Sequence, residues 1–219
     1  GKSLVEMKKI KLLIIDDHPV FRQGLNLVFS KTSDIVVSGE ATEGNEALRK
    51  IKEAHWDVVF LDISLPRENG LDVLKKIKQE CPQLPVLMLS MFPEEQYALR
   101  SAKAGASGYL TKESPPAVLI EAVHQAAAGK KFFSPETVEQ VLLNFDKNFQ
   151  KIPHETLTDR EFQIMRLLAV AKTPSKIAEE LGLSVSTVFA HRSNILTKMD
   201  ISNNAQLMHY AITHGLIEP

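Results

Sequence analysis

Three carboxylates stand where chemistry could occur, because each comes at the end of an apolar run. Asp16 and Asp17 follow Ile10–Ile15, and Asp62 follows residues 58–61. A single aspartate after a strand serves equally well as a helix cap or part of a turn. Three carboxylates brought close together would repel one another and take up protons unless a cation compensates. Mg²⁺ is a hard cation that prefers oxygen ligands, so the sequence predicts a magnesium site if the strands are neighbours.

Two more polar residues follow apolar runs of the same kind. Ser90 comes after residues 85–89, and Lys112 ends a short run that begins at Tyr109. An aspartate accepts a phosphoryl group when negative charge is neutralised during transfer. Lys112 would pair with Asp62 at rest and with phosphate afterwards, and Ser90 would donate a hydrogen bond to a phosphate oxygen. Taken singly, Lys112 reads as a surface lysine and Ser90 as a helix cap, but together they favour phosphoryl transfer.

The elements that position these residues alternate between strand and helix. Strands are predicted at residues 10–15, 35–38, 58–62, 85–89 and 109–111, and helices at 19–29, 44–54, 70–80, 93–104 and 115–128. Val20 and Leu25 are expected on the inner side of the first helix. This alternation predicts an α/β, doubly wound, five-stranded parallel sheet. The carboxyl ends of its strands would bring the polar residues to one crevice.

The pattern changes beyond residue 128. Gly129-Lys130-Lys131 is a break, and residues 135–149 have the apolar stripe of one amphipathic helix, with Val138 and Leu142 on the stripe. Pro153 marks a boundary. We therefore expect a first domain at 7–128, a linker with a helix at 129–154, and a second domain at 155–219.

The second domain has a purely helical pattern. Thr158 and Glu161 have the spacing of a capping box at the start of a helix. A short helix ends at Gly182, Ser184 caps the next helix, Val185–Met199, and a fourth follows with Met208 and Ile212 expected inward. A short helix, a turn containing glycine and a capped helix are the sequence form of a helix-turn-helix.

Composition limits the remaining possibilities. The chain of 219 residues is 44% hydrophobic and 24% charged, which is ordinary for a globular protein. It has no apolar run of the ~20 residues needed to span a bilayer, no recognisable signal peptide, and one cysteine, Cys81. We therefore expect a cytoplasmic protein with no membrane partner. The net charge of −1 means that any nucleic-acid binding depends on a local patch.

These motifs carry a resemblance that covers nearly the whole chain. Residues 9–128 resemble the receiver domain of bacterial two-component response regulators, through Asp16-Asp17, LDISLP with Asp62, Ser90, and Tyr109 placed before Lys112. Residues 155–217 resemble a LuxR-type helix-turn-helix, through LTDRE (157–161), KIAEELGLSVSTV (176–188) and HRSNILTKM (191–199). The chain is identified as a member of the NarL/FixJ subfamily. This implies a flavodoxin-like receiver plus a small all-α DNA-binding domain, and a transcription factor rather than an enzyme.

The resemblance also implies roles for residues of the first domain. Asp62 would be phosphorylated by a sensor histidine kinase, and phosphorylation would free or dimerise the output domain, giving a homodimer. Ser90 and Tyr109 would be the switch pair, with Ser90 moving toward phosphate and the ring of Tyr109 turning inward. The implied Mg²⁺ ligands are Asp17, Asp62 and the backbone carbonyl of Ser64, with Asp16 acting mainly through water.

In the second domain, Val185–Met199 would be the recognition helix for double-stranded DNA. The candidate DNA-binding residues are Lys172, Ser186, Thr187, Phe189, Ala190, Arg192, Ser193 and Lys198. Phe189 departs from the family, which usually has a basic or polar residue there, and Ala171 stands where glycine is usual. From residue 155 onward, six Lys or Arg residues face seven carboxylates. Phe189 therefore either contacts a thymine methyl group or meets another protein.

Two other hypotheses stay open. The first is a regulator that acts through protein contacts and has lost DNA binding, as the exposed aromatic candidate Phe189 and the acidic balance suggest. The second is a small phosphatase or a flavodoxin-like electron carrier on the same sheet. Against the second, no glycine-rich phosphate loop precedes the first helix.

Overall fold

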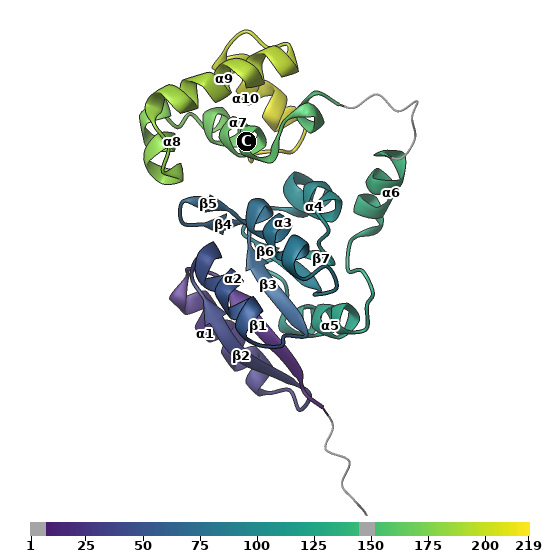
Figure 1. Ribbon diagram of the computed structural model, residues 1–219. Coiled ribbons are helices and arrows are strands. Elements are labelled where there is room, and N and C mark those ends of the chain that lie inside the picture. The colour runs from purple at the N-terminus through teal and green to yellow at the C-terminus, as the bar shows by residue number, and fades with distance from the viewer. Residues whose placement is uncertain (1–7, 145–151) are drawn as a thin grey trace, which may run out of the picture.

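The computed structural model describes residues 8–144 and 152–219, and its first part is built on one parallel sheet (Figure 1). The sheet has five strands in the order β2-β1-β3-β6-β7, and every neighbouring pair is parallel. The predicted doubly wound sheet is confirmed. Its strands are β1 (Ile10–Ile15), β2 (Ile35–Ala41), β3 (Val58–Asp62), β6 (Val86–Ser90) and β7 (Gly108–Thr111).

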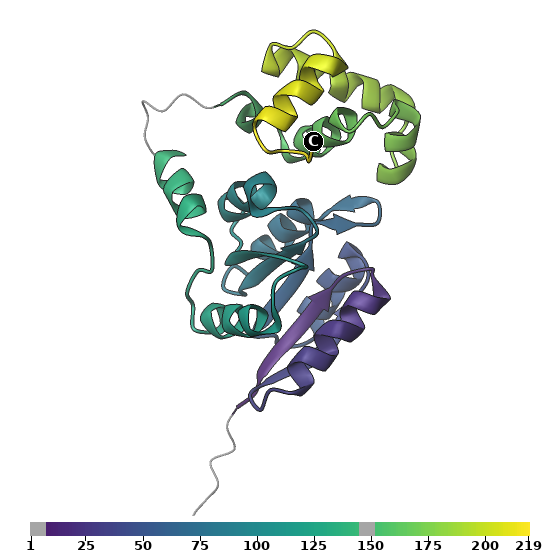
Figure 2. The ribbon, with the colours of Figure 1, turned by 180° about the vertical axis from the view of Figure 1, so that it is seen from behind.

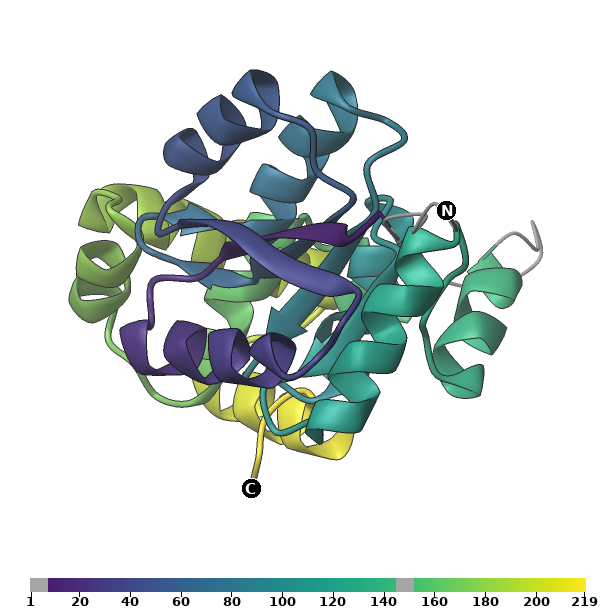
Figure 3. The ribbon, with the colours of Figure 1, turned by 90° about the horizontal axis from the view of Figure 1, so that it is seen from below.

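Helices cover both faces of this sheet (Figure 3). One face packs against α1 (Pro19–Ser30) and α5 (Pro116–Ala127). The other packs against α2 (Gly44–Glu53), α3 (Gly70–Glu80) and α4 (Glu94–Lys103). Every residue of β3 is buried, as expected for a central strand covered on both faces. The unbroken apolar run that predicted this strand therefore reflects its two-sided burial.

A small hairpin follows β3 that the sequence pattern did not predict. It pairs β4 (Ser64–Leu65) with β5 (Glu68–Asn69) in antiparallel fashion. Arg67 has a φ of 59° in the turn. Two-residue strands are too short for an alternation of apolar and polar residues to appear, so only the turn was readable from Pro66 and Gly70.

Some positions that were expected on the inner side of a helix are exposed, and the apolar stripe predicted for the linker helix is also largely exposed. Val20 is 82% exposed, although Leu25 of the same helix is buried. On α6 (Pro135–Asn144), Val138 and Leu142 are 45% and 65% exposed, and the predicted continuation to residue 149 lies outside the described residues. Met208 and Ile212 are also partly exposed. A periodic apolar stripe gives the orientation of a helix, but it does not show whether another element covers that stripe.

The second part of the chain is helical, as predicted. It contains η1 (Pro153–Thr156), α7 (Asp159–Ala169), α8 (Pro174–Leu181), α9 (Val185–Met199) and α10 (Asn204–Thr213). The capping box is present in both directions: Glu161 N donates to Thr158 Oγ1, and Thr158 N donates to the Glu161 carboxylate. Gly182 turns the chain between α8 and α9 with a φ of 66°. Among the residues with described positions, no helix has the length and apolar character to cross a membrane.

Ala171 is strained at the end of α7, because its φ of 65° lies in the left-handed region. That conformation costs an L-residue with a β-carbon roughly 1–2 kcal/mol. We expect Ala171→Gly to raise the free energy of unfolding by about 1 kcal/mol, measured by urea denaturation. The matched change Ala128→Gly, at a helix end where φ is −82°, should give no gain. Equal effects of the two substitutions would contradict the strain argument.

The helical part lies beyond the carboxyl ends of the sheet strands, next to α4 and the β4–β5 hairpin (Figures 1 and 2). Side chains of both parts share one apolar cluster, in which Tyr97 of α4 meets Phe162 of α7 with ring centroids 5.2 Å apart. The two parts are therefore docked on each other in this structure.

Candidate functional site

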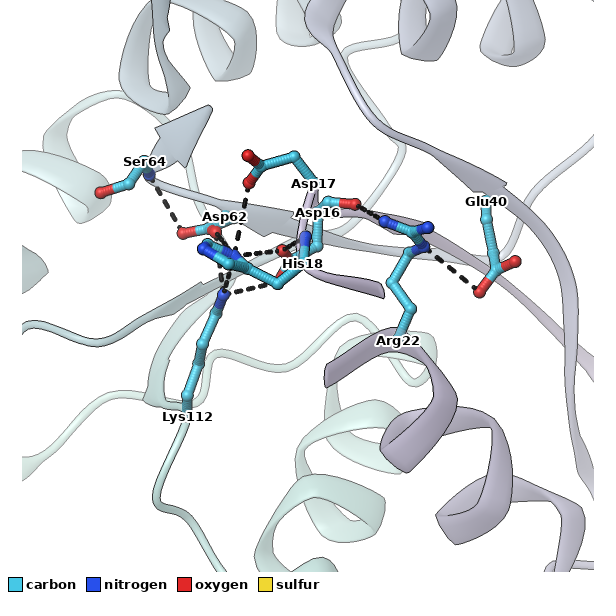
Figure 4. A network of polar contacts seen from close by, with 8 residues as sticks. All are labelled: Asp16, Asp17, His18, Arg22, Glu40, Asp62, Ser64 and Lys112. Carbon is cyan, nitrogen blue, oxygen red and sulfur yellow. Dashed lines mark hydrogen bonds and ion pairs between the residues drawn. The ribbon is translucent and has the colours of Figure 1, made fainter. Parts of the chain in front are cut away.

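The predicted carboxylates and Lys112 meet at the carboxyl edge of the sheet (Figure 4). Asp16 follows β1, Asp62 ends β3, and Lys112 follows β7. Lys112 Nζ lies 2.7 Å from Asp16 Oδ2 and 2.9 Å from Asp62 Oδ2. All three side chains are less than 5% exposed. The ammonium group therefore compensates the two buried carboxylates in this state.

The environment of Asp62 brings the pKa of its carboxyl group closer to neutral pH. Burial raises the pKa of Asp62 to about 6, Lys112 opposes that rise, and Asp16 adds to it. Ser64 N donates a hydrogen bond to Asp62 Oδ1 over 3.0 Å. The carboxylate is thus held by one backbone amide and one ammonium, and a further cation would stabilise its charged form.

His18 belongs to the same cluster, although the sequence analysis did not single it out. Its Nδ1 lies 2.8 Å from Asp16 Oδ1, 3.3 Å from Asp17 Oδ1 and 3.0 Å from Lys112 Nζ. Its backbone N also donates to Asp16 Oδ1. The available signal was its place in the chain, directly after the aspartates and before the proline that starts α1.

The donor set fits a divalent cation. Ligand atoms of Asp16, Asp17, His18 and Asp62 all lie within 4.8 Å of one another. Asp17 Oδ1 is buried and accepts no hydrogen bond from the part of the chain that the structure describes. Several carboxylate oxygens around one point suit Mg²⁺, and among these four residues His18 offers a nitrogen ligand.

Gly70 allows the chain to fold closely around Asp62. A β-carbon on Gly70 would lie 2.3 Å from the carbonyl oxygen of Asp62 and 2.6 Å from Cα of Ile63. Gly70 N donates to Ile63 O over 2.8 Å. Any larger residue would therefore push the start of α3 away from the carboxylate.

Ser90 and Tyr109 are joined through the backbone of Phe92. Ser90 Oγ accepts a hydrogen bond from Phe92 N over 3.0 Å, and Tyr109 OH donates to Phe92 O over 2.7 Å. Both side chains are buried, and burial raises the pKa of Tyr109. The ring of Tyr109, which was expected to turn inward on phosphorylation, is therefore already buried in this structure.

The predicted DNA-contacting residues remain accessible while the two parts are docked. Ser186, Phe189, Ala190 and Ser193 of α9 are exposed, and Thr187 and Arg192 are half-buried. Val188, Ile195 and Met199 face the domain core, as predicted from their spacing. The outward side of α9 is thus a free surface.

Three predicted cationic contacts already have partners inside the helical domain. Lys172 Nζ lies 2.7 Å from Glu180 Oε1, and Lys198 Nζ lies 2.6 Å from Glu161 Oε1. Arg192 Nε donates to Asn204 Oδ1 over 2.9 Å. Binding of a phosphate backbone by these side chains would have to compete with those contacts.

Arg100 of α4 forms the main polar contact between the two parts. Its guanidinium donates to Leu157 O over 2.9 Å, to His154 O over 2.7 Å and to Asp159 Oδ1 over 3.2 Å. Lys75 of α3 pairs with the same carboxylate of Asp159. Both Arg100 and Asp159 are largely buried, so this ion pair is shielded from water.

A second contact links the helical domain to the backbone that Ser90 and Tyr109 hold. The guanidinium of Arg166 lies 4.0 Å from the ring centroid of Phe92 and 5.3 Å from that of Tyr97. Arg166 Nε also donates to Leu216 O over 2.8 Å. Phe92 therefore touches the polar pair on one side and α7 on the other.

His154 makes this contact region sensitive to pH. Burial, with smaller contributions from the charges of His214 and Arg100, lowers the pKa of His154 from 6.5 to about 4. Between pH 6.5 and about 4, His154 is therefore protonated in the unfolded chain but neutral in the folded chain. Stability contributed by neutral His154 is therefore present above pH 6.5 and is lost as the pH falls toward 4.

We expect acidification from pH 7.5 to pH 5 to cost the wild type about 2 kcal/mol more than it costs His154→Gln, measured by urea denaturation. The control is His209→Gln, at an exposed histidine of α10, which should keep the wild-type pH dependence. Identical pH profiles of wild type and His154→Gln would exclude His154 as the source.

Family models match both parts of the chain. The response regulator receiver domain matches residues 12–124, and the luxR family of bacterial regulatory proteins matches residues 155–211. Response regulator GacA of Pseudomonas syringae pv. syringae is 31% identical over 95% of this chain and 98% of its own length. Response regulator protein VraR of Staphylococcus aureus is 33% identical over 95% of this chain and 99% of its own length.

Solved structures of response regulators are similar to this chain over most of its length. Response regulator ChrA of a heme-sensing two-component system is 30% identical, covers 95% of this chain and 99% of its own, and gives a TM-score of 0.51. RcsB from Salmonella enterica serovar Typhimurium, bound to promoter rprA in the presence of phosphomimetic BeF3-, gives a TM-score of 0.65 over 92% of this chain and 98% of its own. At 20% identity, RcsB supports the fold alone.

Proposed function

Because this chain belongs to the NarL/FixJ-type response regulators, which join a receiver domain to a LuxR-type helix-turn-helix, we propose that phosphorylation of Asp62 controls its binding to DNA. The chain is a transcription regulator rather than an enzyme. The observation that carries the proposal is the buried cluster of Asp62, Asp16 and Lys112. We divide the chain into a receiver at 7–128, a linker at 129–154 and a DNA-binding domain at 155–219.

In the proposed reaction, a carboxylate oxygen of Asp62 attacks the phosphorus of a phosphohistidine on a sensor kinase. The P–N bond breaks, an acyl phosphate forms on Asp62, and the kinase histidine is released. Mg²⁺ held by Asp16, Asp17, Asp62 and the carbonyl of Ser64 would neutralise negative charge around the phosphoryl group. Lys112 would exchange its contact with Asp62 for a phosphoryl oxygen.

Phe92 offers a physical route from the phosphoryl group to the helical domain. Movement of Ser90 toward the phosphoryl group would remove the acceptor of Phe92 N, while Tyr109 holds Phe92 O. The ring of Phe92 lies under Arg166, so a shift of this backbone alters the docked surface. A local change in charge thereby biases a two-state contact.

The released domain would bind double-stranded DNA as a dimer. The match of residues 155–211 to the luxR family of bacterial regulatory proteins supports this part of the proposal, and RcsB, which has the same fold, is itself bound to promoter DNA. Only a few cations are available on the helical domain, so a single copy would bind weakly. Two copies held together gain an effective-concentration advantage at paired half-sites.

The experiment is light scattering of the full chain with Mg²⁺, with and without a small phosphodonor. We expect mass spectrometry to show one phosphoryl group on the wild type, and light scattering to show a doubled molar mass. Asp62→Ala should stay monomeric. Asp72→Ala, at a carboxylate of α3 outside the cluster, should behave as the wild type does.

The outcomes separate the parts of the proposal. Dimerisation of Asp62→Ala under phosphodonor would show that another group is the switch. If the wild type is phosphorylated but its molar mass in light scattering stays that of a monomer, the first consequence of phosphorylation is domain release rather than dimerisation.

A further inference from the structure

The outward side of α9 carries an apolar pair. Val185 is 40% exposed and Phe189 is 53% exposed. Residues four apart on a helix share a face, so the two side chains form one surface. No element of the described chain covers this surface, even with the domains docked. A phenylalanine left this open in the fold costs free energy, which is recovered when a partner covers it.

The position of the pair points to its partner. Val185 is the first residue of α9 and Phe189 is the fifth, and the N-terminal residues of a recognition helix are those that contact base edges. Exposed neighbours on the same side are small, namely Ser186, Ala190 and Ser193. Small neighbours let Phe189 approach the floor of a groove.

The chemistry of the major groove offers one apolar group, the C5 methyl of thymine. We propose that Val185 and Phe189 recognise thymine methyl groups, so that each half-site carries T·A pairs opposite the start of α9. This inference rests on the proposed function and specifies the sequence class of its target. Sequence preference then comes from shape and methyl contact. The cationic side chains near α9 already have partners: Lys172 bonds to Glu180, Arg192 to Asn204 and Lys198 to Glu161.

The test begins with selection of duplexes from a random library by the full chain with Mg²⁺ and a small phosphodonor. The selected half-site is then synthesised with deoxyuridine in place of single thymines, which removes the methyl group and leaves base pairing unchanged. Affinity is measured by fluorescence anisotropy. We expect the wild type to bind about fourfold more weakly for each contacted methyl group removed.

Variants assign that loss to the apolar pair. Phe189→Ala should bind the thymine duplex roughly tenfold more weakly and should be indifferent to deoxyuridine. Phe189→Leu should keep the sensitivity to deoxyuridine. Leu142→Ala, which removes an even more exposed apolar side chain from α6, should bind as the wild type does.

Three results would overturn the inference, and they have two different meanings. A selected duplex whose affinity ignores deoxyuridine, or a Phe189→Ala variant that keeps the wild-type loss, would refute methyl recognition while leaving the proposed function in place. Enrichment of no duplex would refute both and assign the apolar pair to a protein partner.

Discussion

Lys112→Ala will lower the free energy of unfolding by about 3–5 kcal/mol in the absence of divalent cations. The substitution leaves the carboxylates of Asp16 and Asp62 buried with no ammonium between them, since Lys112 Nζ is within 2.9 Å of both. Mg²⁺ should restore more stability to the variant than to the wild type, because a cation that binds only the folded state stabilises it by mass action. Urea denaturation in EDTA and in Mg²⁺ measures both effects.

The matched control is Lys76→Ala. Lys76 pairs with Glu68 over 2.8 Å but is 51% exposed, so its loss should cost at most about 1 kcal/mol and should not depend on Mg²⁺. If Lys112→Ala lowered the free energy of unfolding in EDTA as little as Lys76→Ala does, the cluster would have to be solvated in the unphosphorylated protein.

Arg100→Ala will open the chain without phosphorylation. The change removes three charge-assisted hydrogen bonds to the helical domain and leaves Asp159 with Lys75 alone. Hydrogen bonds to charged groups contribute about 1.5–3 kcal/mol each when buried, which is enough to shift a docking equilibrium by more than tenfold. Small-angle X-ray scattering should show a larger radius of gyration for the variant than for the wild type.

Lys52→Ala provides the comparison for Arg100→Ala. Lys52 pairs with Glu80 over 3.5 Å on the far side of the receiver domain, so the variant should scatter as the wild type does. An unchanged radius of gyration for Arg100→Ala, with an intact circular dichroism spectrum, would mean that the apolar contact of Tyr97 with Phe162 suffices for docking.

The sequence predicted the sheet and the assembly of the cluster because both follow from local patterns. The buried strand β3 shows itself as an unbroken apolar run, and the topology of a parallel sheet then brings Asp16 and Lys112 to Asp62. The helix-turn-helix was readable from its caps, Thr158 and Ser184, whose hydrogen bonds the structure contains.

The remaining features depend on contacts between distant residues, which no local pattern encodes. Arg100 reaches Asp159 across 59 positions of sequence, and Arg166 meets Phe92 only because α7 docks on α4. The exposure of Val20 and Leu142 likewise depends on which helices have a neighbour. His18 was missed because its role comes from the three groups around its ring rather than from a motif.

The outward side of α9 is accessible in the docked protein, and this has a consequence for how the regulator is kept inactive. Docking does not inactivate the protein by covering this side of α9, because Phe189, Ala190 and Ser193 are exposed while the domains are docked. Under the proposed function, control then falls on dimerisation: one subunit would contact half of a target, and transcriptional output would require two. In such a scheme the active species varies with the square of the phosphorylated concentration when dimers are scarce, so a modest change in kinase activity becomes a larger change in transcription.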